Sequence, residues 1–443
     1  MAAGFEEFEI TWRKDVFSGA PQAGSAASFG TLGINFRARK AADREALDAA
    51  SSRETPAQEA PARRATQEGG SPQGDAINMQ ALRGMLERGE RVTVVDVRKG
   101  EDRAEWSIPG SVHVDAYDAL NAGDERAMDG LELPEGAPVV TVCGRGRSSA
   151  VAAEQLRERG YEALTLEGGM KSWSLAWNSA EVPVEGSDAA VVQIRRTGKG
   201  CLSYLVGSRG EAAVIDAAVD PQVYAGYAGL AEERGWRITH VLDTHVHADH
   251  LSRSRTLAEL TGAELHMPAG ASVSYTVSPL GEGEEVRIGA ARLRALRTPG
   301  HTSESTSYHL DGKALFTGDT LFLSTVGRPD LEATPEGARE KAHALFGSVR
   351  RLRDLPSQTL VLPGHTSEPV PFDGEPIFAP LLEVREEVGP LLEDEEHFVD
   401  KVASRLTPTP ENYERIVEHN RVGDWPQGDP TELEAGANHC AAG

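Results

Sequence analysis

The sequence predicts two α/β domains in series, preceded by an extension that is poor in apolar residues. Its length of 443 residues exceeds the roughly 150 residues expected of one domain. Strands alternate with helices over residues 73–182, which indicates a parallel sheet covered by helices. From residue 190 onward, short strands joined by glycine-containing turns favour an antiparallel β-layer. We therefore expect domains at 73–182 and 190–443, joined by a linker at 183–189, with a helical part at the end of the second.

Residues 1–72 form the extension. They are rich in Ala, Gly, Ser, Glu, Arg and Pro, and apart from two short apolar patches they offer little surface to bury. A chain of this kind does not gain enough from burial to offset the loss of conformational entropy. We expect this stretch to be disordered, with one helix at 41–50.

The elements of the two domains follow from hydrophobic periodicity and from turn residues. In the first domain we expect a helix at 77–86, strands at 91–97 and 137–142, and a helix at 149–159. In the second we expect strands at 191–194, 201–206 and 212–215, a helix at 221–235, and a strand at 238–243.

Charge and composition restrict the partners and the compartment. The net charge of -24 disfavours binding to nucleic acid or to an anionic membrane, since both are negative. The three cysteines are too few for a disulfide framework, so we expect a reducing compartment. There is no basic, apolar leader at the start and no apolar run long enough for a membrane span, which favours the cytoplasm.

Histidines gather in the second half of the chain. Twelve of the 13 lie beyond residue 239, and the segment THVHADH occupies 244–250. Further polar residues follow small-residue turns at strand ends: His301, Asp319 and His365. Loops on a rigid sheet can bring such groups together, and imidazole and carboxylate are ligands suited to zinc or iron. Surface or packing roles are expected for His240, His266, His309, His343, His397, His419 and His439.

A second chemical signal is the loop CGRGRSS at 143–149, between a buried strand and a helix. Backbone N–H groups and the start of the helix would surround the sulfur of Cys143 with positive potential, to which Arg145 and Arg147 add. These features favour a thiolate nucleophile. Cys201, inside an expected strand, and Cys440, near the end of the chain, have no charged loop and are not expected to be catalytic.

The first domain resembles a single-domain rhodanese. The resemblance rests on VDVR at 95–98, SIPGS at 107–111, the loop that starts at Cys143, and LEGGMKSW at 166–173. It implies that Cys143 accepts sulfane sulfur and passes it to a thiol or to sulfite. Arg145, Arg147 and Ser148 would contact the donor. Rhodaneses commonly place arginine five residues after the cysteine, where this chain has Ser148.

The second domain resembles the metallo-β-lactamase superfamily, which implies an αβ/βα sandwich. THVHADH, PGHTSESTSY at 299–308 and FTGDTLF at 316–322, leading to GRPDL at 327–331, further resemble the persulfide dioxygenases. That branch implies one Fe(II) per chain, held by a facial triad with three open positions. The triad would be His245, His301 and Asp319. The remaining motif residues would act around the metal or hold a second one: His247, Asp249, His250 and His365.

The same resemblance implies the substrates. A low-molecular-weight thiol persulfide such as glutathione persulfide would react with O₂ to give sulfite and thiol, and the rhodanese domain would interconvert persulfide and thiosulfate. Tyr204, Arg328 and Asp330 are expected to contact the substrate. Self-association into a homo-oligomer is compatible with the sequence.

Two alternatives remain at this point. One is a dinuclear zinc thioester hydrolase of the glyoxalase II kind with an attached rhodanese domain, because all seven candidate ligands for two metals are present. The other is a non-enzymatic sulfur sensor or carrier that uses the extension to bind a partner, which would leave the intact metal set without a purpose.

Overall fold

The computed structural model describes residues 5–14, 33–40, 74–220, 226–404, 409, 412–434 and 440–442. The chain divides into two units, residues 1–67 and 68–443. In the first unit, β1 (Phe5–Lys14) pairs antiparallel with β2 (Gly33–Lys40). These two strands fall within the stretch expected to be disordered, and their sequences largely alternate between apolar and polar residues as strands do. The helix expected at 41–50 lies outside the described residues.

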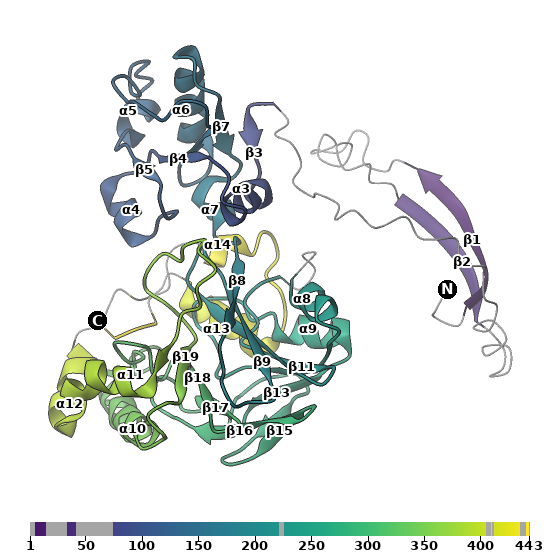
Figure 1. Cartoon of the computed structure of the whole chain (residues 1–443), viewed down its shortest axis with the longest axis vertical. Coiled ribbons are helices and arrows are strands. Elements are labelled where there is room, and N and C mark those ends of the chain that lie inside the picture. Colours follow the sequence, from purple (N-terminus) through teal and green to yellow (C-terminus); the bar gives the residue numbers. More distant parts are fainter. Residues whose placement is uncertain are drawn as a thin grey trace. The chain divides into compact units, whose positions relative to one another are not determined.

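The first α/β domain is built on a parallel five-stranded sheet of order β3-β7-β6-β4-β5. Its strands are β3 (Ala76–Ile77), β4 (Thr93–Asp96), β5 (Val112–His113), β6 (Val139–Val142) and β7 (Ala163–Leu166). Its helices are α3 (Met79–Glu87), α4 (Gly100–Glu105), α5 (Tyr117–Asn121), α6 (Arg147–Glu158) and α7 (Gly169–Trp173). Figure 1 shows these helices around the sheet.

Apolar residues cover both faces of this sheet. Successive side chains of a strand point to opposite faces, so the neighbours Val94 and Val95 belong to different clusters. Val95 packs in the cluster that contains Leu156 of α6, and Val94 in the cluster that contains Leu82 of α3 and Trp173 of α7. All five side chains are buried. Burial on both faces is typical of a parallel sheet.

The second domain contains two mixed sheets. The seven-stranded sheet has the order β14-β13-β12-β11-β10-β9-β8, and the six-stranded sheet the order β15-β16-β17-β18-β19-β20. The first comprises β8 (Asn178–Val182), β9 (Ala190–Arg195), β10 (Leu202–Ser208), β11 (Glu211–Ile215), β12 (Arg237–Leu242), β13 (Glu264–Pro268) and β14 (Ser278–Leu280). The second comprises β15 (Glu285–Ile288), β16 (Ala291–Arg297), β17 (Thr306–Leu310), β18 (Ala314–Gly318), β19 (Leu360–Pro363) and β20 (Ala379–Pro380).

These sheets are the inner layers of a four-layer sandwich. Tyr204 from one sheet and Phe316 from the other meet in the central core, with ring centroids 4.9 Å apart. Val214 packs outward with Leu257 of α9 (Ser254–Thr261), in the cluster that α8 (Tyr227–Glu233) also joins. On the other side, Leu345 of α10 (Pro335–Arg353) packs in a cluster with α11 (Leu381–Val388). The predicted fold class, two α/β domains of which the second is a sandwich, is confirmed.

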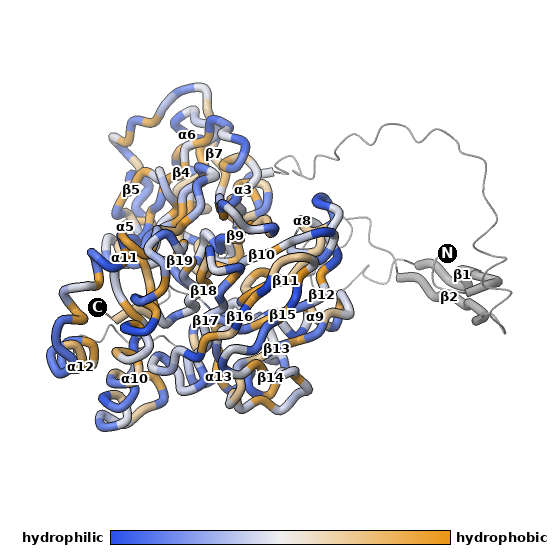
Figure 2. The backbone as a smooth tube through the Cα atoms, turned by 60° about the horizontal axis from the view of Figure 1, so that its bottom comes forward, coloured by the Kyte–Doolittle hydropathy of each residue, from blue (hydrophilic) through white to orange (hydrophobic). Residues whose placement is uncertain are grey.

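The strand β8 lies at the edge of the seven-stranded sheet and pairs antiparallel with β9. Residues 183–189, expected to link the two domains, therefore connect two strands of one sheet. Figure 2 shows that the central strands β10 and β11 are largely hydrophobic, as expected for strands covered on both faces.

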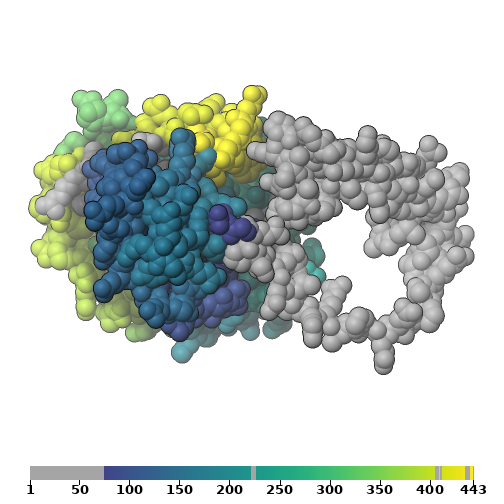
Figure 3. Space-filling model, turned by 90° about the horizontal axis from the view of Figure 1, so that it is seen from above, coloured from purple at the N-terminus to yellow at the C-terminus, as the bar shows by residue number. Residues whose placement is uncertain are grey.

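The last part of the chain is helical, with the short 3₁₀ helix η1 (Gly389–Leu392), α12 (Glu395–Ser404), α13 (Tyr413–Val422) and α14 (Thr431–Glu434). Around α14, Glu432 pairs with Arg145 at 3.1 Å and Asp429 pairs with Lys171 at 2.8 Å. Figure 3 accordingly shows yellow C-terminal atoms beside blue atoms of the first domain. Within the described residues, no helix is both long and apolar enough to cross a membrane.

Candidate metal centre and cysteine loop

The side chains of the histidine motif converge with those of three other strand ends. The THVHADH segment follows β12, and His301, Asp319 and His365 follow β16, β18 and β19. Because these strands end at the same side of the sandwich, residues far apart in sequence become neighbours. All seven candidate ligands are buried: His245, His247, Asp249, His250, His301, Asp319 and His365.

The first group of donor atoms comes from His245, His301 and Asp319, and its ligand atoms all lie within 4.8 Å of one another. The Nε2 atoms of His245 and His301 each lie 3.8 Å from Asp319 Oδ2. These separations exceed hydrogen-bond distance. The three atoms therefore face one another around a shared point without bonding directly.

The other nitrogen of each of these imidazoles is fixed by a hydrogen bond. The Thr244 hydroxyl donates to Asp216 Oδ2 at 2.9 Å, so His245 Nδ1–H must donate to Thr244 Oγ1, also at 2.9 Å. His301 Nδ1–H donates to the carbonyl of Arg328 at 2.8 Å. Both rings thus present an Nε2 lone pair to the centre, as metal-binding histidines do.

His247 is oriented by carboxylates. Its Nε2 lies 3.3 Å from Asp216 Oδ1 and 3.8 Å from Asp243 Oδ1. The neighbouring His245 ring lies 4.3 Å away between centroids. Sequence reasoning missed Asp216 and Asp243. The available signal was an aspartate directly after each of two apolar strands, β11 and β12.

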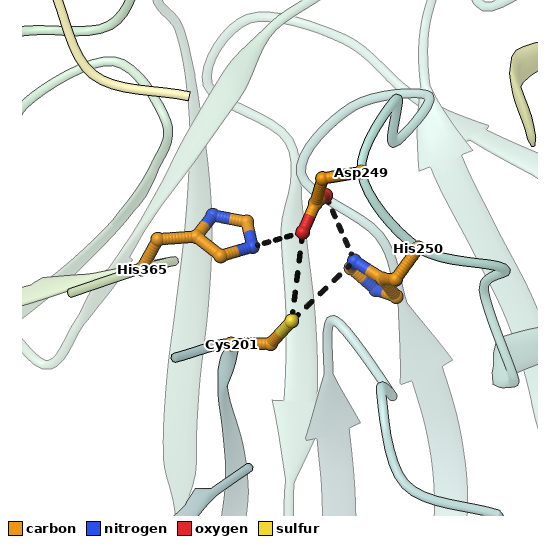
Figure 4. Close-up of side chains that lie close together, drawn as sticks. All are labelled: Cys201, Asp249, His250 and His365. Atoms are coloured by element: carbon orange, nitrogen blue, oxygen red, sulfur yellow. Dashed lines mark hydrogen bonds and ion pairs between the residues drawn. The ribbon is translucent and has the colours of Figure 1, made fainter. Parts of the chain in front are cut away.

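A second group of donors adjoins the first and is drawn in Figure 4. It comprises Cys201, Asp249, His250 and His365, with ligand atoms again within 4.8 Å of one another. His365 Nε2 lies 2.9 Å from Asp249 Oδ2, and its Nδ1–H donates to Asp319 Oδ1 at 2.6 Å. The two oxygens of Asp319 thereby face the two groups.

The first group carries the protonation states that metal ligands need. Burial and the neighbouring His247 hold the pKa of His245 well below its usual range. Burial opposes ionisation of Asp319, but the His365 imidazole outweighs it and holds the carboxyl pKa far below its usual range. His247, His250 and His365 differ. Their aspartate neighbours overcome the effect of burial and raise the pKa of each imidazole above the usual value.

Several buried donor atoms at the centre have no hydrogen-bond partner among the described residues. They are His245 Nε2, His247 Nδ1, His250 Nε2 and Asp319 Oδ2. A buried polar atom left unpaired costs about 1–3 kcal/mol, so a cluster of them in one place needs an explanation. Metal ions fit it, since imidazole nitrogen and carboxylate oxygen are the usual donors to zinc and to iron.

Two buried cysteines also border the centre, although the sequence offered no reason to place them there. Cys201 joins the second group, and Cys440 lies with Asp319 and His365. Burial and Asp249 raise the pKa of Cys201, but His250 and His365 outweigh them and lower it to about 6. No charged loop was expected around either cysteine, and the charged groups that surround them come instead from other strands.

Of the three residues expected to contact the substrate here, Tyr204 is held by the core. It is 1% exposed within the core between the sheets, and its hydroxyl donates to the carbonyl of Pro363 at 2.6 Å. It supports the turn that carries His365. Arg328 and Asp330 form a bidentate pair at 2.8 Å, and Arg328 is buried, so this is not a surface salt bridge.

Other histidines lie outside the two donor groups. His240 and His266 contact each other at 3.0 Å between ring nitrogens, and His343 pairs with Glu395 at 2.8 Å. His419 pairs with Asp424 at 2.6 Å. His439 lies outside the described residues.

In the first domain, Cys143 follows β6 and is buried, and the backbone N–H of Gly146 donates to its sulfur at 3.1 Å. The loop packs tightly on Gly169, whose backbone has φ +60°, because a Cβ there would overlap the carbonyl oxygen of Cys143. The next residue, Met170, donates its N–H to that oxygen at 2.8 Å. This packing holds the loop in place around the sulfur.

The expected substrate contacts of this loop point in different directions. Arg145 is exposed and pairs with Glu432, Arg147 is exposed at the start of α6, and the Ser148 hydroxyl donates to Asn121 at 3.1 Å. A cavity of about 230 Å³ lies beside the loop, lined by Gly144, Arg145 and Lys171 among others.

The sequence matches two families in agreement with these folds. Residues 78–176 match the "Rhodanese-like domain" and residues 196–365 match the "Metallo-beta-lactamase superfamily". The chain therefore consists of a rhodanese-like domain followed by a metallo-β-lactamase domain, beyond the N-terminal unit.

Similar proteins are known for the second domain. The hydroxyacylglutathione hydrolases of Rhodospirillum rubrum and Methylococcus capsulatus are each 39% identical over 37% of this chain and 60% of their own length. The chain thus spans about three fifths of these relatives. A solved structure, ETHE1 from Myxococcus xanthus, has 31% identity and a TM-score of 0.46, covering 52% of this chain and 97% of that one.

The relatives correct the expected activity. Proteins 35–39% identical to this chain are named hydroxyacylglutathione hydrolases, which contradicts the expectation of a persulfide dioxygenase and favours the hydrolase alternative. The expected single Fe(II) and the O₂ partner rested on the same resemblance. The details that suggested it, such as the glycine and threonine turns around His301 and Asp319, lie around donors that both chemistries use.

Proposed function

We propose that the metallo-β-lactamase domain hydrolyses glutathione thioesters at a centre of two zinc ions. The observation that carries the proposal is the cluster of buried donor atoms without hydrogen-bond partners, in two adjoining groups that meet at Asp319. Two metals side by side are a common arrangement for hydrolysis. The names of the relatives support the substrate class.

The protein would hold one ion with His245, His301 and Asp319, aided by His247, and the other with Asp249, His250 and His365. When bound, such ions lower the pKa of a bound water toward about 7 and polarise a carbonyl oxygen. The residues around them keep the ligands in place: Thr244 and Arg328 fix two imidazole rings.

A cavity beside the centre supports a glutathione-derived substrate. Its volume is about 240 Å³, and His301, Lys341 and Arg421 are among the lining residues. Arg421 pairs with Glu332 at 2.8 Å, and Lys341 donates to the carbonyl of Leu331, also at 2.8 Å. The lining also includes Glu304 and Glu332, so charged groups of both signs are available to a glutathionyl group, which itself carries an amine and two carboxylates.

The test is a hydrolysis assay on the full chain, purified with its metals and counted for them. We expect about two zinc ions per chain and loss of the thioester absorbance of an acyl-glutathione with release of free thiol. One metal per chain, or no thiol release with the centre fully loaded, would refute the proposal.

For the rhodanese-like domain, the proposal is sulfur transfer at Cys143. The thiolate would attack the outer sulfur of thiosulfate, the S–S bond would break with sulfite as the leaving group, and a second thiol would then take the sulfur from the cysteine persulfide. Glutathione released by the other domain belongs to that acceptor class. Cys143→Ser should abolish sulfite release from thiosulfate while thioester hydrolysis continues; loss of both activities would contradict two separate sites.

A further inference from the structure

We propose that Cys201 is a protein ligand of the second metal ion, so that this site combines a thiolate with a carboxylate and two imidazoles. The inference rests on the proposed two-metal centre and specifies one of its sites. Its basis is the side-chain group drawn in Figure 4, in which Cys201, Asp249, His250 and His365 present donor atoms within 4.8 Å of one another.

The backbone holds Cys201 against the ligand turn. Cys201 forms an isolated antiparallel bridge with His365. On one side of this bridge Leu202 N–H donates to the Gly364 carbonyl at 2.8 Å, and on the other Thr366 N–H donates to the carbonyl of Gly200 at 3.0 Å. The sulfur is therefore fixed next to His365 by main-chain bonds and does not depend on a flexible loop.

The distances around the sulfur suit a shared ion. Cys201 Sγ lies 3.5 Å from Asp249 Oδ2 and 3.9 Å from His250 Nδ1. Zinc bonds of about 2.3 Å to sulfur and about 2.1 Å to oxygen, at a tetrahedral angle, would place those two atoms about 3.6 Å apart. The distance between Asp249 Oδ2 and His365 Nε2 is shorter, at 2.9 Å, which is the separation of an ion pair. A bound metal ion would move these two atoms apart.

Burial and unpaired atoms supply an independent observation. Cys201, Asp249 and His250 are each 1% exposed, and His250 Nε2 has no hydrogen-bond partner among the described residues. A buried free thiol usually packs against apolar side chains. This one is instead surrounded by imidazole and carboxylate groups. Cys440 is the less suitable thiol, because it groups with Asp319 and His365 alone.

A thiolate would give the two sites different chemistry. Sulfur is a soft donor that favours zinc over magnesium or manganese, and four protein donors close a tetrahedral shell. The second ion would then serve as a firmly held anchor that leaves Asp319 available to the first site. The first site would carry the reactive water.

Cobalt(II) substitution of the full chain tests the assignment. The matched variants are Cys201→Ser and Cys440→Ser, each made in a Cys143→Ser background so that the rhodanese thiol cannot bind cobalt. We expect a sulfur-to-cobalt charge-transfer band in the near ultraviolet for the background protein and for Cys440→Ser, and its loss in Cys201→Ser. A band that survives in Cys201→Ser, or that disappears only in Cys440→Ser, overturns the proposal.

A second measurement needs no cysteine-201 variant and so does not depend on its folding. X-ray absorption at the zinc edge of the zinc-loaded chain should show a sulfur shell at about 2.3 Å; nitrogen and oxygen shells alone would overturn the assignment. Counting the metals separates the two proposals. Two ions without a sulfur signal leave the hydrolase proposal standing, whereas one ion with a sulfur signal supports Cys201 and contradicts the two-metal centre.

Discussion

Glu434 accepts a hydrogen bond from the backbone N–H of Leu251 at 2.7 Å. Leu251 directly follows His250, so a residue of the C-terminal α14 supports the end of the histidine motif. Glu434 is fully buried and also pairs with Arg196 at 3.0 Å and with Arg253 at 2.8 Å. Two buried guanidinium groups therefore depend on this one carboxylate.

Replacing Glu434 by glutamine should destabilise the chain by roughly 3–5 kcal/mol, because it leaves two buried cations without their counter-charge. Burial raises the pKa of Glu434, but Arg196 and Arg253 outweigh it and hold the pKa far below its usual range. The wild-type advantage should thus be complete above the unfolded pKa of about 4.3 and be lost as the pH falls below it. Urea unfolding at neutral and acid pH measures this. The exposed Glu418→Gln is the control, and an equally small effect of both changes would contradict the prediction.

Replacing His301 by alanine should lower both zinc content and thioester hydrolysis. The change removes a donor of the first group, and metal polarisation supplies several kcal/mol of transition-state stabilisation, so the rate should fall about 1000-fold or more. Metal analysis and the thiol-release assay measure the two effects. The exposed His397→Ala should change neither. Full zinc content together with full activity in His301→Ala would remove this residue from the centre.

Asp216→Asn should weaken zinc binding roughly 10- to 100-fold, as expected for a group that orients metal ligands. Asp216 Oδ1 accepts from Thr244 N–H at 2.7 Å and lies 3.3 Å from His247 Nε2. A chelator competition measures the affinity. Asp311→Asn is a matched control, since both aspartates have positive φ, 53° and 48°. Asp216 groups with Asp243 and His247, whereas Asp311 is in no such group among the described residues. Equal affinity of the two variants would contradict the assigned role.

Gly169→Ala should abolish sulfur transfer and destabilise the first domain. A Cβ at this position overlaps the carbonyl of Cys143, whereas Gly160, which also has positive φ, has open space around it. Both substitutions place an alanine in the left-handed backbone conformation, which costs about 1–2 kcal/mol. Only the additional destabilisation of Gly169→Ala therefore measures the clash with the cysteine loop. Thermal unfolding and the sulfite-release assay should separate the variants, and identical behaviour would show that the loop tolerates displacement.

Local patterns were sufficient for the fold of the two domains, and they also pointed to residues that the structure brings together. The alternation of strands and helices before residue 182 and the strand-end turns at His301, Asp319 and His365 were enough, because both signals are contained in short windows. The boundary at 183–189 was less accurate, since the strand at Asn178–Val182 is defined by its pairing with β9. Sequence alone does not contain that pairing.

The two cysteines show what the sequence could not reveal about the site. Cys201 gains its polar surroundings from Asp249, His250 and His365, which lie far along the chain. No residue next to Cys201 in the sequence indicates that these groups are close to it. Tyr204 is a related case: it lies in the core between the sheets, where its hydroxyl donates a hydrogen bond to the carbonyl of Pro363. Contacts between distant strands decide both outcomes.

Because β8 is the edge strand of its sheet, the choice of the first residue matters when the second domain is prepared alone. A fragment that starts at residue 183 would lose this strand and turn β9 into a bare edge, with a row of unpaired backbone groups that invites aggregation. A fragment that starts just before Asn178 would keep the edge covered. The better boundary between the two domains, both for gene fusion and for the preparation of fragments, therefore lies before Asn178 and not at the linker-like segment 183–189.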